Sequence, residues 1–212
     1  MTSVTKERIP YRIEVDGGPV IRCWDPHDAP LLKEAVDSSL EHLRAWMPWA
    51  YDEPQDIDAK AALLRQFRGN FDLGQDFIFG VFSPDEAQVL GGSGLHTRIG
   101  DGAFEIGYWV RADAVRRGIA TSVAGSLTRV GIEFGGADRI EIRVDVDNEV
   151  SSRIPRRLGY REEGILRRRL PTHDGSPQRD AVIFSMFAED LAGSPAARVP
   201  FASFDSRGLP VL

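Results

Sequence analysis

The feature of this sequence that most constrains its fold lies between residues 118 and 146, where a helical pattern is followed by a strand pattern. Beyond Gly118 the apolar residues recur at steps of four, four, three and four residues, which puts them on one face of a helix. The next segment, RIEIRVDV at 139–146, alternates apolar and charged side chains, as a strand with one buried face does. A chain with these two patterns in succession is expected to build a sheet covered by helices.

The rest of the chain extends this pattern on both sides. Further strands are predicted at residues 17–24, 76–82, 88–96, 102–110, 161–171 and 180–191, and further helices at 31–46, 57–71 and 151–160. The last helix contains Pro155, which is expected to be tolerated only near a first turn. This order predicts a mixed α/β (α+β) protein with a central, largely antiparallel sheet flanked by helices.

The ends of the chain differ in composition from its middle. Residues 1–17 are expected to form an N-terminal extension, residues 18–191 a single domain, and residues 192–212 a tail rich in Gly, Pro and Ser. For the tail two alternatives stay open: it is disordered, or it lies over the surface of the domain.

Composition argues against several classes of function. A net charge of −6 disfavours general nucleic-acid binding, which needs a basic surface, and is compatible with a cationic substrate such as an amine. No apolar run approaches the ~20 residues of a membrane span, and the first residues lack the apolar segment of a signal peptide, so a cytoplasmic protein is expected. The single cysteine, Cys23, lies in a strand pattern and is expected to be a buried, inert thiol.

The segment ADAVRRGIAT at residues 112–121 joins a predicted strand to a predicted helix and has the parts of an anion site. The first N–H groups of a helix have no partner within the helix and lie at the positive end of its dipole. Gly118 carries no Cβ that would keep a phosphate away from these groups. Taken alone, the segment also fits an ordinary turn with a solvated basic patch, in which Gly118 serves only the bend.

The motifs that follow this segment occur in a recognisable order. After the Arg-Arg-Gly-Ile-Ala helix and the alternating strand come Asn148 and Ser151, in an Asn-x-x-Ser motif, and then Leu-Gly-Tyr at 158–160. This order closely resembles the GNAT superfamily of N-acetyltransferases. The stretches LRAWMPWA, IGYWV and LGY resemble its RimJ/RimL-type branch, which acetylates protein N-termini and assorted small amines. The resemblance extends over residues 18–191.

The resemblance implies that acetyl-CoA binds where the sheet splays open between its fourth and fifth predicted strands, 102–110 and 139–146. The backbone of Val110 would pair with the pantetheine arm, the backbone amides of residues 116–121 would cradle the pyrophosphate, and Asn148 would bond the pantetheine region. The residues that it puts against the donor are Val110, Val115, Arg116, Arg117, Gly118, Ile119, Ala120, Thr121, Asn148 and Ser151. It implies no metal.

The sequence departs from the family pattern at two positions. Val115 stands where the family usually carries Gln or Arg, but a cradle made of backbone amides needs no particular side chain there. Pro155 stands where many members carry a general-acid tyrosine. In RimL-like members the serine of Asn-x-x-Ser protonates the departing thiolate instead, and Ser151 is that residue here. The alternative role for Ser151 is to cap the short helix.

The reaction that the resemblance implies is direct attack of a neutral amine on a thioester carbonyl, with no covalent enzyme intermediate. The oxyanion needs a donor, most simply a backbone N–H near Tyr108. The first candidate for the base is Glu105, for which the alternative is an exposed strand glutamate. The second candidate is His96, for which the alternative is a purely structural role.

The aromatic stretch with Trp46, Met47 and Trp49 is expected to line the acceptor side, and its alternative is a hydrophobic corner of the core. The expected partners are acetyl-CoA and an amine, either a protein N-terminus or a small molecule, with no nucleic acid and no membrane. A homodimer is expected by analogy with the family. Two other functions stay open: a catalytically inactive CoA-binding sensor or regulator, and a plain α/β binding domain without CoA.

Overall fold

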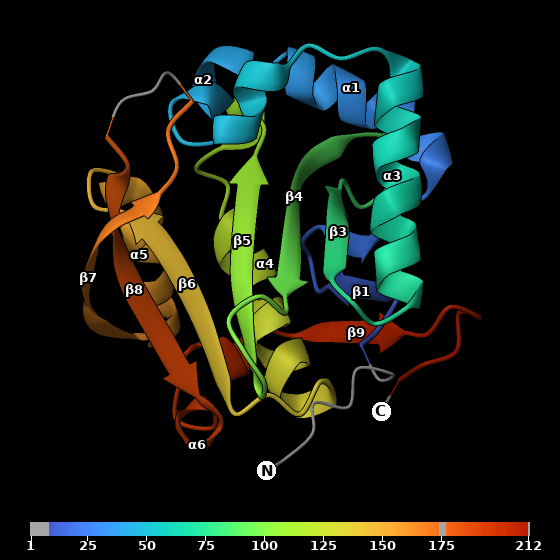
Figure 1. Cartoon of the computed structure of the whole chain (residues 1–212). Coiled ribbons are helices and arrows are strands. Elements are labelled where there is room, and N and C mark those ends of the chain that lie inside the picture. Colours follow the sequence, from blue (N-terminus) through green and yellow to red (C-terminus); the bar gives the residue numbers. More distant parts are fainter. Residues whose placement is uncertain (1–8, 174–176, 212) are drawn as a thin grey trace.

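The sheet that the alternating segments predict is present, and it is larger than expected. In the computed structural model, which describes residues 9–173 and 177–211, nine strands form one sheet in the order β7-β8-β6-β5-β4-β3-β2-β1-β9 (Figure 1). The strands are β1 (Arg12–Val15), β2 (Val20–Cys23), β3 (Phe77–Phe82), β4 (Val89–His96), β5 (Ala103–Val110), β6 (Arg139–Asp145), β7 (Arg161–Leu170), β8 (Arg179–Phe187) and β9 (Phe201–Phe204). Neighbouring strands are antiparallel except β5 and β6, which are parallel. The predicted mixed, largely antiparallel sheet is confirmed.

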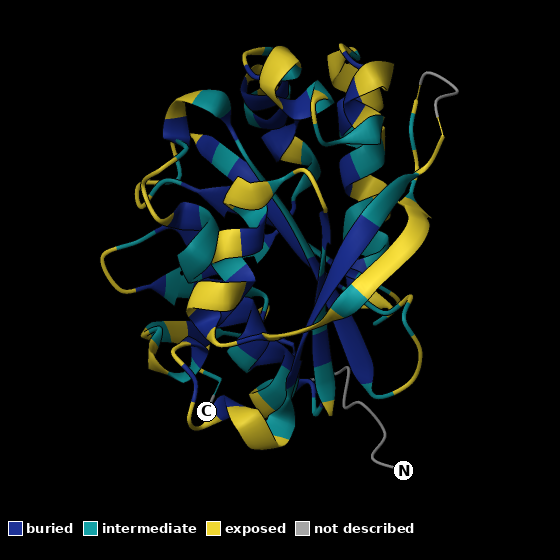
Figure 2. Cartoon of the chain, turned by 90° about the vertical axis from the view of Figure 1, so that its left-hand side faces the viewer, coloured by how far each residue is buried: buried dark blue, intermediate teal, exposed yellow. Residues whose placement is uncertain are grey.

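Helices cover both faces of this sheet, as predicted. They are α1 (Ala29–Asp37), α2 (Leu40–Arg44), α3 (Ile57–Asp72), α4 (Ile119–Arg129), α5 (Glu149–Leu158) and α6 (Ala188–Leu191). In Figure 1, α3 lies in front of the sheet, α4 and α5 lie behind it, and α1 and α2 lie at the end toward which β5 points. The central strands are buried, whereas the edge strand β7 is exposed along most of its length (Figure 2). Within the described ranges, no helix is long and apolar enough to cross a membrane.

The elements with the strongest periodicity form as predicted. The helix expected after Gly118 is α4, which buries one apolar face and continues through a π-helical turn, Val130–Phe134, as far as Gly135. The strand expected at 139–146 is β6, in which buried residues alternate with half-buried ones over most of its length.

Two helix predictions are wrong in detail. The helix expected at 31–46 is divided into α1 and α2, because two serines interrupt it. Ser38 Oγ donates to the Ala35 carbonyl oxygen at 3.2 Å, and Ser39 Oγ accepts from the backbone N–H of Ala112 at 3.0 Å. Pro155 lies well inside α5 and not near its first turn, because α5 already begins at Glu149.

Both chain ends contribute strands that the sequence patterns do not reveal. β1 pairs with β2 and with β9, so segments near the two ends together complete the sheet. Val199 packs directly over Gly125 of α4, and the guanidinium of Arg129 donates to the Val199 carbonyl oxygen at 2.9 Å. Up to residue 211 the C-terminal tail therefore lies over the surface of the domain.

The sheet opens between β5 and β6. β5 pairs with β4 over six residue pairs, from His96–Glu105 to Gly91–Val110, but with β6 over only three, at residues 103–105. Beyond Glu105 the two strands diverge (Figure 1). The splay that was expected between the fourth and fifth predicted strands therefore lies between β5 and β6.

A buried arginine holds the free end of β5 on the β4 side. Arg111 is 6% exposed, and its guanidinium donates to both carboxylate oxygens of Glu34 on α1, at 2.9 Å each. The same group bonds Asp113 Oδ1 at 2.6 Å and the carbonyl oxygen of Val89 on β4 at 3.3 Å. These contacts tie the end of β5 to α1 and β4, so the edge of β5 that faces β6 stays open.

The contacts of the C-terminal segment predict that it stabilises the domain. A chain that ends at Leu191 loses β9 and the apolar contacts of Val199 and Phe201, and we expect its melting temperature to fall by about 5 °C or more. A control chain that ends at Asp205 keeps β9 and should stay within about 2 °C of the full chain. Thermal unfolding followed by circular dichroism measures both. Equal melting temperatures for all three chains would mean that the tail contributes nothing to the stability of the domain.

Candidate functional site

The open edge of β5 presents backbone groups to the gap. In an antiparallel pair the backbone groups of successive residues point alternately toward and away from the partner strand. Arg111 N donates to the Leu90 carbonyl oxygen on the β4 side at 2.9 Å, so the backbone groups of Tyr108 and Val110 point away from β4 and into the gap. Within the described part of the chain, no strand pairs with them there. This edge is therefore able to accept an extended ligand as an added strand.

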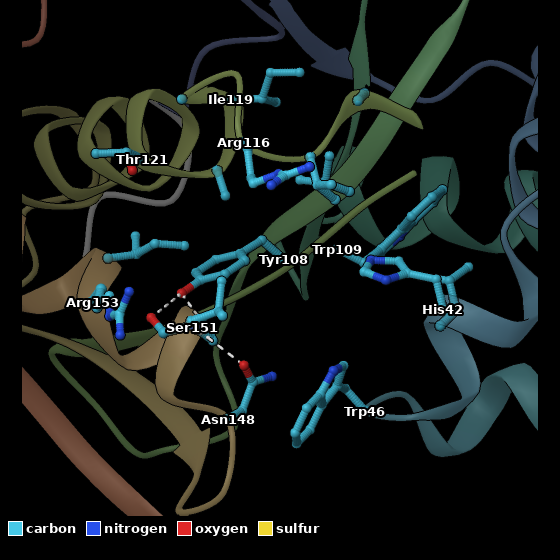
Figure 3. Close-up of a pocket in the computed structure, with 18 of the residues that line it drawn as sticks. His42, Trp46, Tyr108, Trp109, Arg116, Ile119, Thr121, Asn148, Ser151 and Arg153 are labelled. Carbon is cyan, nitrogen blue, oxygen red and sulfur yellow. Dashed lines mark hydrogen bonds between the residues drawn. The ribbon is translucent and has the colours of Figure 1, made fainter. Parts of the chain in front are cut away.

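A cavity of about 690 Å³ lies along this edge, between β5, the start of α4, α5 and α2 (Figure 3). It brings together nearly all the residues that the sequence analysis assigned to a donor. Its walls include Val110, Val115, Arg116, Gly118, Ile119, Ala120, Thr121, Asn148 and Ser151. Arg117 is the exception, because its guanidinium turns back and donates to the Asp113 carbonyl oxygen at 2.7 Å.

The start of α4 has the geometry that an anion cradle requires. Gly118 adopts a φ of 80°, a left-handed conformation that favours glycine, and a Cβ at this position would meet no atom within 4 Å. Arg116 has a φ of 63°, so the backbone makes two left-handed steps just before the helix. The space in front of Gly118 is open, and the first turn of α4 borders it with N–H groups that have no partner within the helix. These residues fit a phosphate group.

Two arginines of α5 also line this cavity. Arg153 and Arg157 lie one helical turn apart on α5, and both border the cavity. Arg156 turns away from it and donates to Glu162 Oε2 at 3.0 Å. Arg153 and Arg157 are four residues apart, as side chains on one face of a helix are. This spacing, just after the Asn-x-x-Ser motif, is the sequence signal that distinguishes them from Arg156. Together with Arg116 they make the walls of this cavity electropositive.

Two hydroxyl groups meet at the centre of the site. Tyr108 Oη lies 3.0 Å from Ser151 Oγ and donates to the Ser151 carbonyl oxygen at 3.4 Å (Figure 3). Asn148 Oδ1 accepts from Ser151 N at 3.0 Å, so Asn148 caps α5, and the alternative in which Ser151 is the cap is wrong. Burial raises the pKa of Tyr108 to about 12, although the hydrogen bond to Ser151 opposes the rise. The phenol is therefore protonated, and able to donate, at neutral pH.

Pro155 explains why the Tyr108 hydroxyl reaches the backbone of α5. In an uninterrupted helix the Ser151 carbonyl would accept from the N–H of the residue four positions later, but a proline there has no N–H. The Tyr108 hydroxyl donates to this carbonyl instead. The proline that replaces the expected tyrosine thus frees a backbone acceptor that orients a different tyrosine, from β5.

A second cavity, of about 620 Å³, lies on the other face of β5, toward α1 and α3. Six residues border both cavities: Trp46, Met47, Tyr108, Trp109, Asn148 and Ser151. The two cavities therefore meet at the gap between β5 and β6. Two ligands that occupy one cavity each would come together beside Tyr108.

Aromatic side chains form the wall where the two cavities meet. Trp46 and Met47 border both cavities, and Trp49 borders the second. The rings of Trp49 and Trp109 contact each other edge to face, with their centroids 5.9 Å apart. The sequence does not place Trp109 in this wall, because strand alternation alone does not tell which face of a strand lines a cavity.

A buried ion pair holds the loop that carries Trp49. The side chains of Lys60 on α3 and Glu53 are 1% and 4% exposed and are bonded to each other. Glu53 Oε2 accepts from Gln55 N at 2.9 Å, and the guanidinium of Arg44 donates to the Glu53 carbonyl oxygen at 2.7 Å. The loop between α2 and α3 is thereby fixed at both its side-chain and its backbone atoms.

Glu105 lines the second cavity and is not the exposed strand glutamate of the alternative, since it is only 7% exposed. Its carboxylate is paired with Arg98, whose Nε lies 3.2 Å from Oε2, and with Arg143, whose Nε lies 3.5 Å from the same oxygen. Both contacts come from guanidinium groups, so the carboxylate oxygens of Glu105 already have cationic partners.

His96 stands opposite Glu105 in the register of β4 and β5 and lines the same cavity. Its Nδ1 lies 3.1 and 3.0 Å from the two carboxylate oxygens of Asp76. The two candidate bases therefore differ in their partners: Glu105 contacts cations, whereas His96 contacts an anion.

The single cysteine of the chain lies outside both cavities. Cys23 is buried on β2, as predicted, and burial raises the pKa of its thiol to about 12, which leaves it protonated and inert. In the residues that the structure describes, no group of three or more His, Cys, Asp or Glu side chains is arranged to hold a metal ion.

Comparison with known sequences finds one protein family and related proteins of similar length. The family model for the acetyltransferase (GNAT) domain matches residues 20–161 of the chain. The chain is 26% identical over 176 residues to YdaF of Bacillus subtilis (strain 168), which bears the provisional name of a ribosomal N-acetyltransferase. That match covers 82% of this chain and 93% of YdaF.

Comparison with solved structures finds the same fold. RimJ of Mycobacterium smegmatis, solved in complex with CoA-disulfide, superposes with a TM-score of 0.74 at 24% identity, over 88% of this chain and 90% of RimJ. The microcin C7 self-immunity acetyltransferase MccE, solved with acetyl-CoA and AMP, superposes with a TM-score of 0.73 at 19% identity, over 80% of this chain and 92% of MccE.

The raised pKa of Tyr108 predicts a pH dependence of stability. The folded state keeps this proton to higher pH than the unfolded state, so the contribution is present below about pH 10 and is lost as the pH rises toward about 12. We expect the free energy of unfolding, measured by urea denaturation, to fall less steeply with pH over this range in Tyr108→Phe than in the parent. The difference between the two slopes should correspond to up to about one bound proton per molecule. Tyr51→Phe removes an exposed phenol and is the matched control. Parallel losses of stability in Tyr108→Phe and the parent would contradict the raised pKa.

Proposed function

We propose, from the premise that this chain belongs to the GNAT acetyltransferase family and is an acyl-CoA-dependent N-acetyltransferase, that it transfers acetyl from acetyl-CoA directly to a primary amine. The observation that carries the proposal is the open edge of β5 between two cavities, one of which contains a helix start suited to an anion. A donor and an acceptor on the two sides of this gap would meet beside Tyr108. The amine itself attacks, so no covalent enzyme intermediate is proposed.

The cavity beside α4 would hold the donor. The first turn of α4, with Gly118 before it, would bind the pyrophosphate through backbone N–H groups, and Arg116 would add positive charge. The backbone groups of Val110 would pair with the pantetheine arm, and Asn148, whose Oδ1 caps α5, would offer its amide N–H groups. In support, the cavity measures about 690 Å³, and RimJ and MccE, which share the fold, were solved with CoA-disulfide and with acetyl-CoA.

Two sets of donors would serve the chemistry. The backbone N–H of Tyr108 points into the gap and would stabilise the oxygen on which negative charge develops during the attack. The paired hydroxyls of Tyr108 and Ser151 would supply the proton that the departing sulfur needs. Because Ser151 Oγ touches both Tyr108 Oη and the two cavities, it would pass the proton on from the phenol.

For the acceptor we propose a protein N-terminal α-amine, with a small-molecule amine as the alternative. An α-ammonium group has a pKa of about 7.7–8.0, against about 10.4 for a lysine side chain, so its deprotonation asks far less of a base. The provisional name of YdaF refers to ribosomal proteins, which supports the first choice. MccE, solved with acetyl-CoA and AMP, supports the second.

The proposed function is tested by incubating the purified protein with acetyl-CoA and a panel of amines. The panel contains peptides with a free α-amine, the same peptides with a blocked N-terminus and a free lysine, a polyamine and single amino acids. We expect release of the CoA thiol, and a gain in mass of one acetyl group, with the α-amine peptides. Binding of CoA without release in any reaction would favour the inactive sensor instead, and absence of CoA binding would favour the plain binding domain.

The proposed pyrophosphate cradle predicts that neighbouring substitutions differ in effect. Gly118→Glu adds a Cβ and a carboxylate to the open space at a φ of 80°, and we expect the affinity for CoA in calorimetric titration to fall ~100-fold or more. Arg116→Ala leaves the backbone N–H groups in place and should weaken binding by about tenfold or less. Gly74→Glu, at a φ of 63° on the turn after α3, is the matched control and should bind as the parent does. Equal affinity for CoA in all these proteins would show that the start of α4 does not bind the pyrophosphate.

The hydroxyl pair predicts a loss of turnover without loss of donor binding. We expect Ser151→Ala and Tyr108→Phe each to lower kcat by roughly 10–100-fold with little change in the KM for acetyl-CoA, because the backbone contacts remain. The double variant should lose little more than either single variant, because the two groups act as one unit. Tyr51→Phe is the control and should keep the parent kcat. Steady-state kinetics with the best acceptor provides the measurement, and parent-like kcat in both single variants would exclude the proton-donor role.

A further inference from the structure

The imidazole of His96 lies over two glycines that face each other on β4 and β5. Gly94 and Gly107 are directly opposite in the register of the two strands. A Cβ at Gly94 would come within 3.0 Å of His96 Cε1 and Nε2, and a Cβ at Gly107 within 3.5 Å of Nε2. The two glycines therefore leave room for the ring, which leans along the strands toward Tyr108 and the point where β5 parts from β6.

Asp76 holds the opposite side of this ring. Both carboxylate oxygens of Asp76 lie within 3.1 Å of His96 Nδ1. A carboxylate only accepts hydrogen bonds, so the neutral ring carries its proton on Nδ1 and presents the lone pair of Nε2. His96 lines the acceptor cavity, whereas Asp76 stands behind it, outside the lining. The hydrogen bond therefore directs the basic nitrogen of His96 toward the acceptor.

The charged groups around His96 come from several elements. Glu105 faces it from β5 and is shared by Arg98, which follows β4, and by Arg143 of β6, which also pairs with Glu141. The Lys60–Glu53 pair lines the same cavity and is likewise paired. Asp76 is the charged group in direct contact with the ring. Of the two carboxylates beside the ring, Glu105 is bonded to cations, whereas Asp76 is bonded to His96 and interacts with Arg98 without forming an ion pair.

We propose that His96 is the base that takes the proton from the acceptor ammonium group, and that Asp76 is the positioning residue that orients it. This inference rests on the proposed acetyl transfer. Nε2 accepts one ammonium proton, the freed nitrogen lone pair forms the C–N bond to the acetyl carbon, and the C–S bond breaks. The sulfur gains a proton from the hydroxyl pair of Tyr108 and Ser151. The second proton that the amine loses then restores this hydroxyl pair. His96 finally returns its proton to solvent, so one proton is released for each acetyl group transferred.

The first test compares His96→Gln with a matched control. His27 also forms a hydrogen bond with an aspartate, Asp25, through Nδ1 at 2.6 Å, but its side chain is 98% exposed and lies outside both cavities. With an α-amine peptide as acceptor, we expect kcat/KM in His96→Gln to fall ~100-fold or more at neutral pH and to recover in part above about pH 8, where the α-ammonium group loses its proton without a base. His27→Gln should keep the parent profile. CoA affinity should be the same in all three proteins, because the donor cavity lies on the other side of β5.

The second test asks whether a base is missing or the fold is damaged. His96→Ala leaves a space above Gly94 and Gly107, and added imidazole should restore part of its activity, which a purely structural role would not allow. Asp76→Asn replaces the carboxylate that fixes the orientation of the ring, so kcat should fall by about tenfold with little change in the KM for acetyl-CoA. Glu105→Gln should keep the dependence of kcat/KM on pH that the parent shows.

The outcomes separate this inference from the proposed function. If the parent protein transfers acetyl to no amine, the proposed function itself fails. If the parent is active but His96→Gln keeps the rate and pH profile of the parent, the assignment of His96 is overturned. A loss of rate in Glu105→Gln that high pH restores, together with the parent rate in His96→Gln, would transfer the role to Glu105. A parent-like kcat in Asp76→Asn would overturn the positioning role of Asp76.

Discussion

The incomplete pairing of β5 is the constraint on which the rest of this structure depends. The strand pairs with β4 over six residue pairs and with β6 over only three, so one of its edges keeps free backbone groups. Arg111 maintains this state, because its buried guanidinium ties the end of β5 to Glu34 of α1 and to the backbone of β4. A fully paired sheet would close the gap, and the cavities on its two faces would no longer meet.

The centre of the site illustrates how one residue changes the surroundings of another. Pro155 in α5 has no N–H, so the Ser151 carbonyl loses its helical partner. The Tyr108 hydroxyl fills that vacancy, and its oxygen thereby comes to lie 3.0 Å from Ser151 Oγ. Pro155, which departs from the expected family pattern, thereby helps to position the hydroxyl pair that links β5 to α5.

The two cavities differ in electrostatic character. Arg116, Arg153 and Arg157 surround the one beside α4, where the first N–H groups of the helix add their own positive potential. In the other, Glu53 and Glu105 are paired with Lys60 and Arg98, and His96 is bonded to Asp76, which lies outside the lining. The division suits an anionic donor on one side of β5 and, on the other, an acceptor that must give up a proton. This difference between the two cavities follows from the alternation of side chains along β5, because successive residues point toward opposite faces of the sheet.

Sequence patterns alone determined the order of strands and helices, the amphipathic α4 with Gly118 before it, and the resemblance that led to the family. Each of these depends on spacing or residue type within a short segment. The patterns did not reveal β1 and β9, whose pairing joins the two ends of the chain, nor the break at Ser39, which is bonded to Ala112. Only the tertiary structure decided that Tyr108 meets Ser151, that Arg98 and Arg143 contact Glu105, and that Asp76 is bonded to His96. These contacts join distant segments, and their geometry is set by how the sheet opens and not by any local pattern.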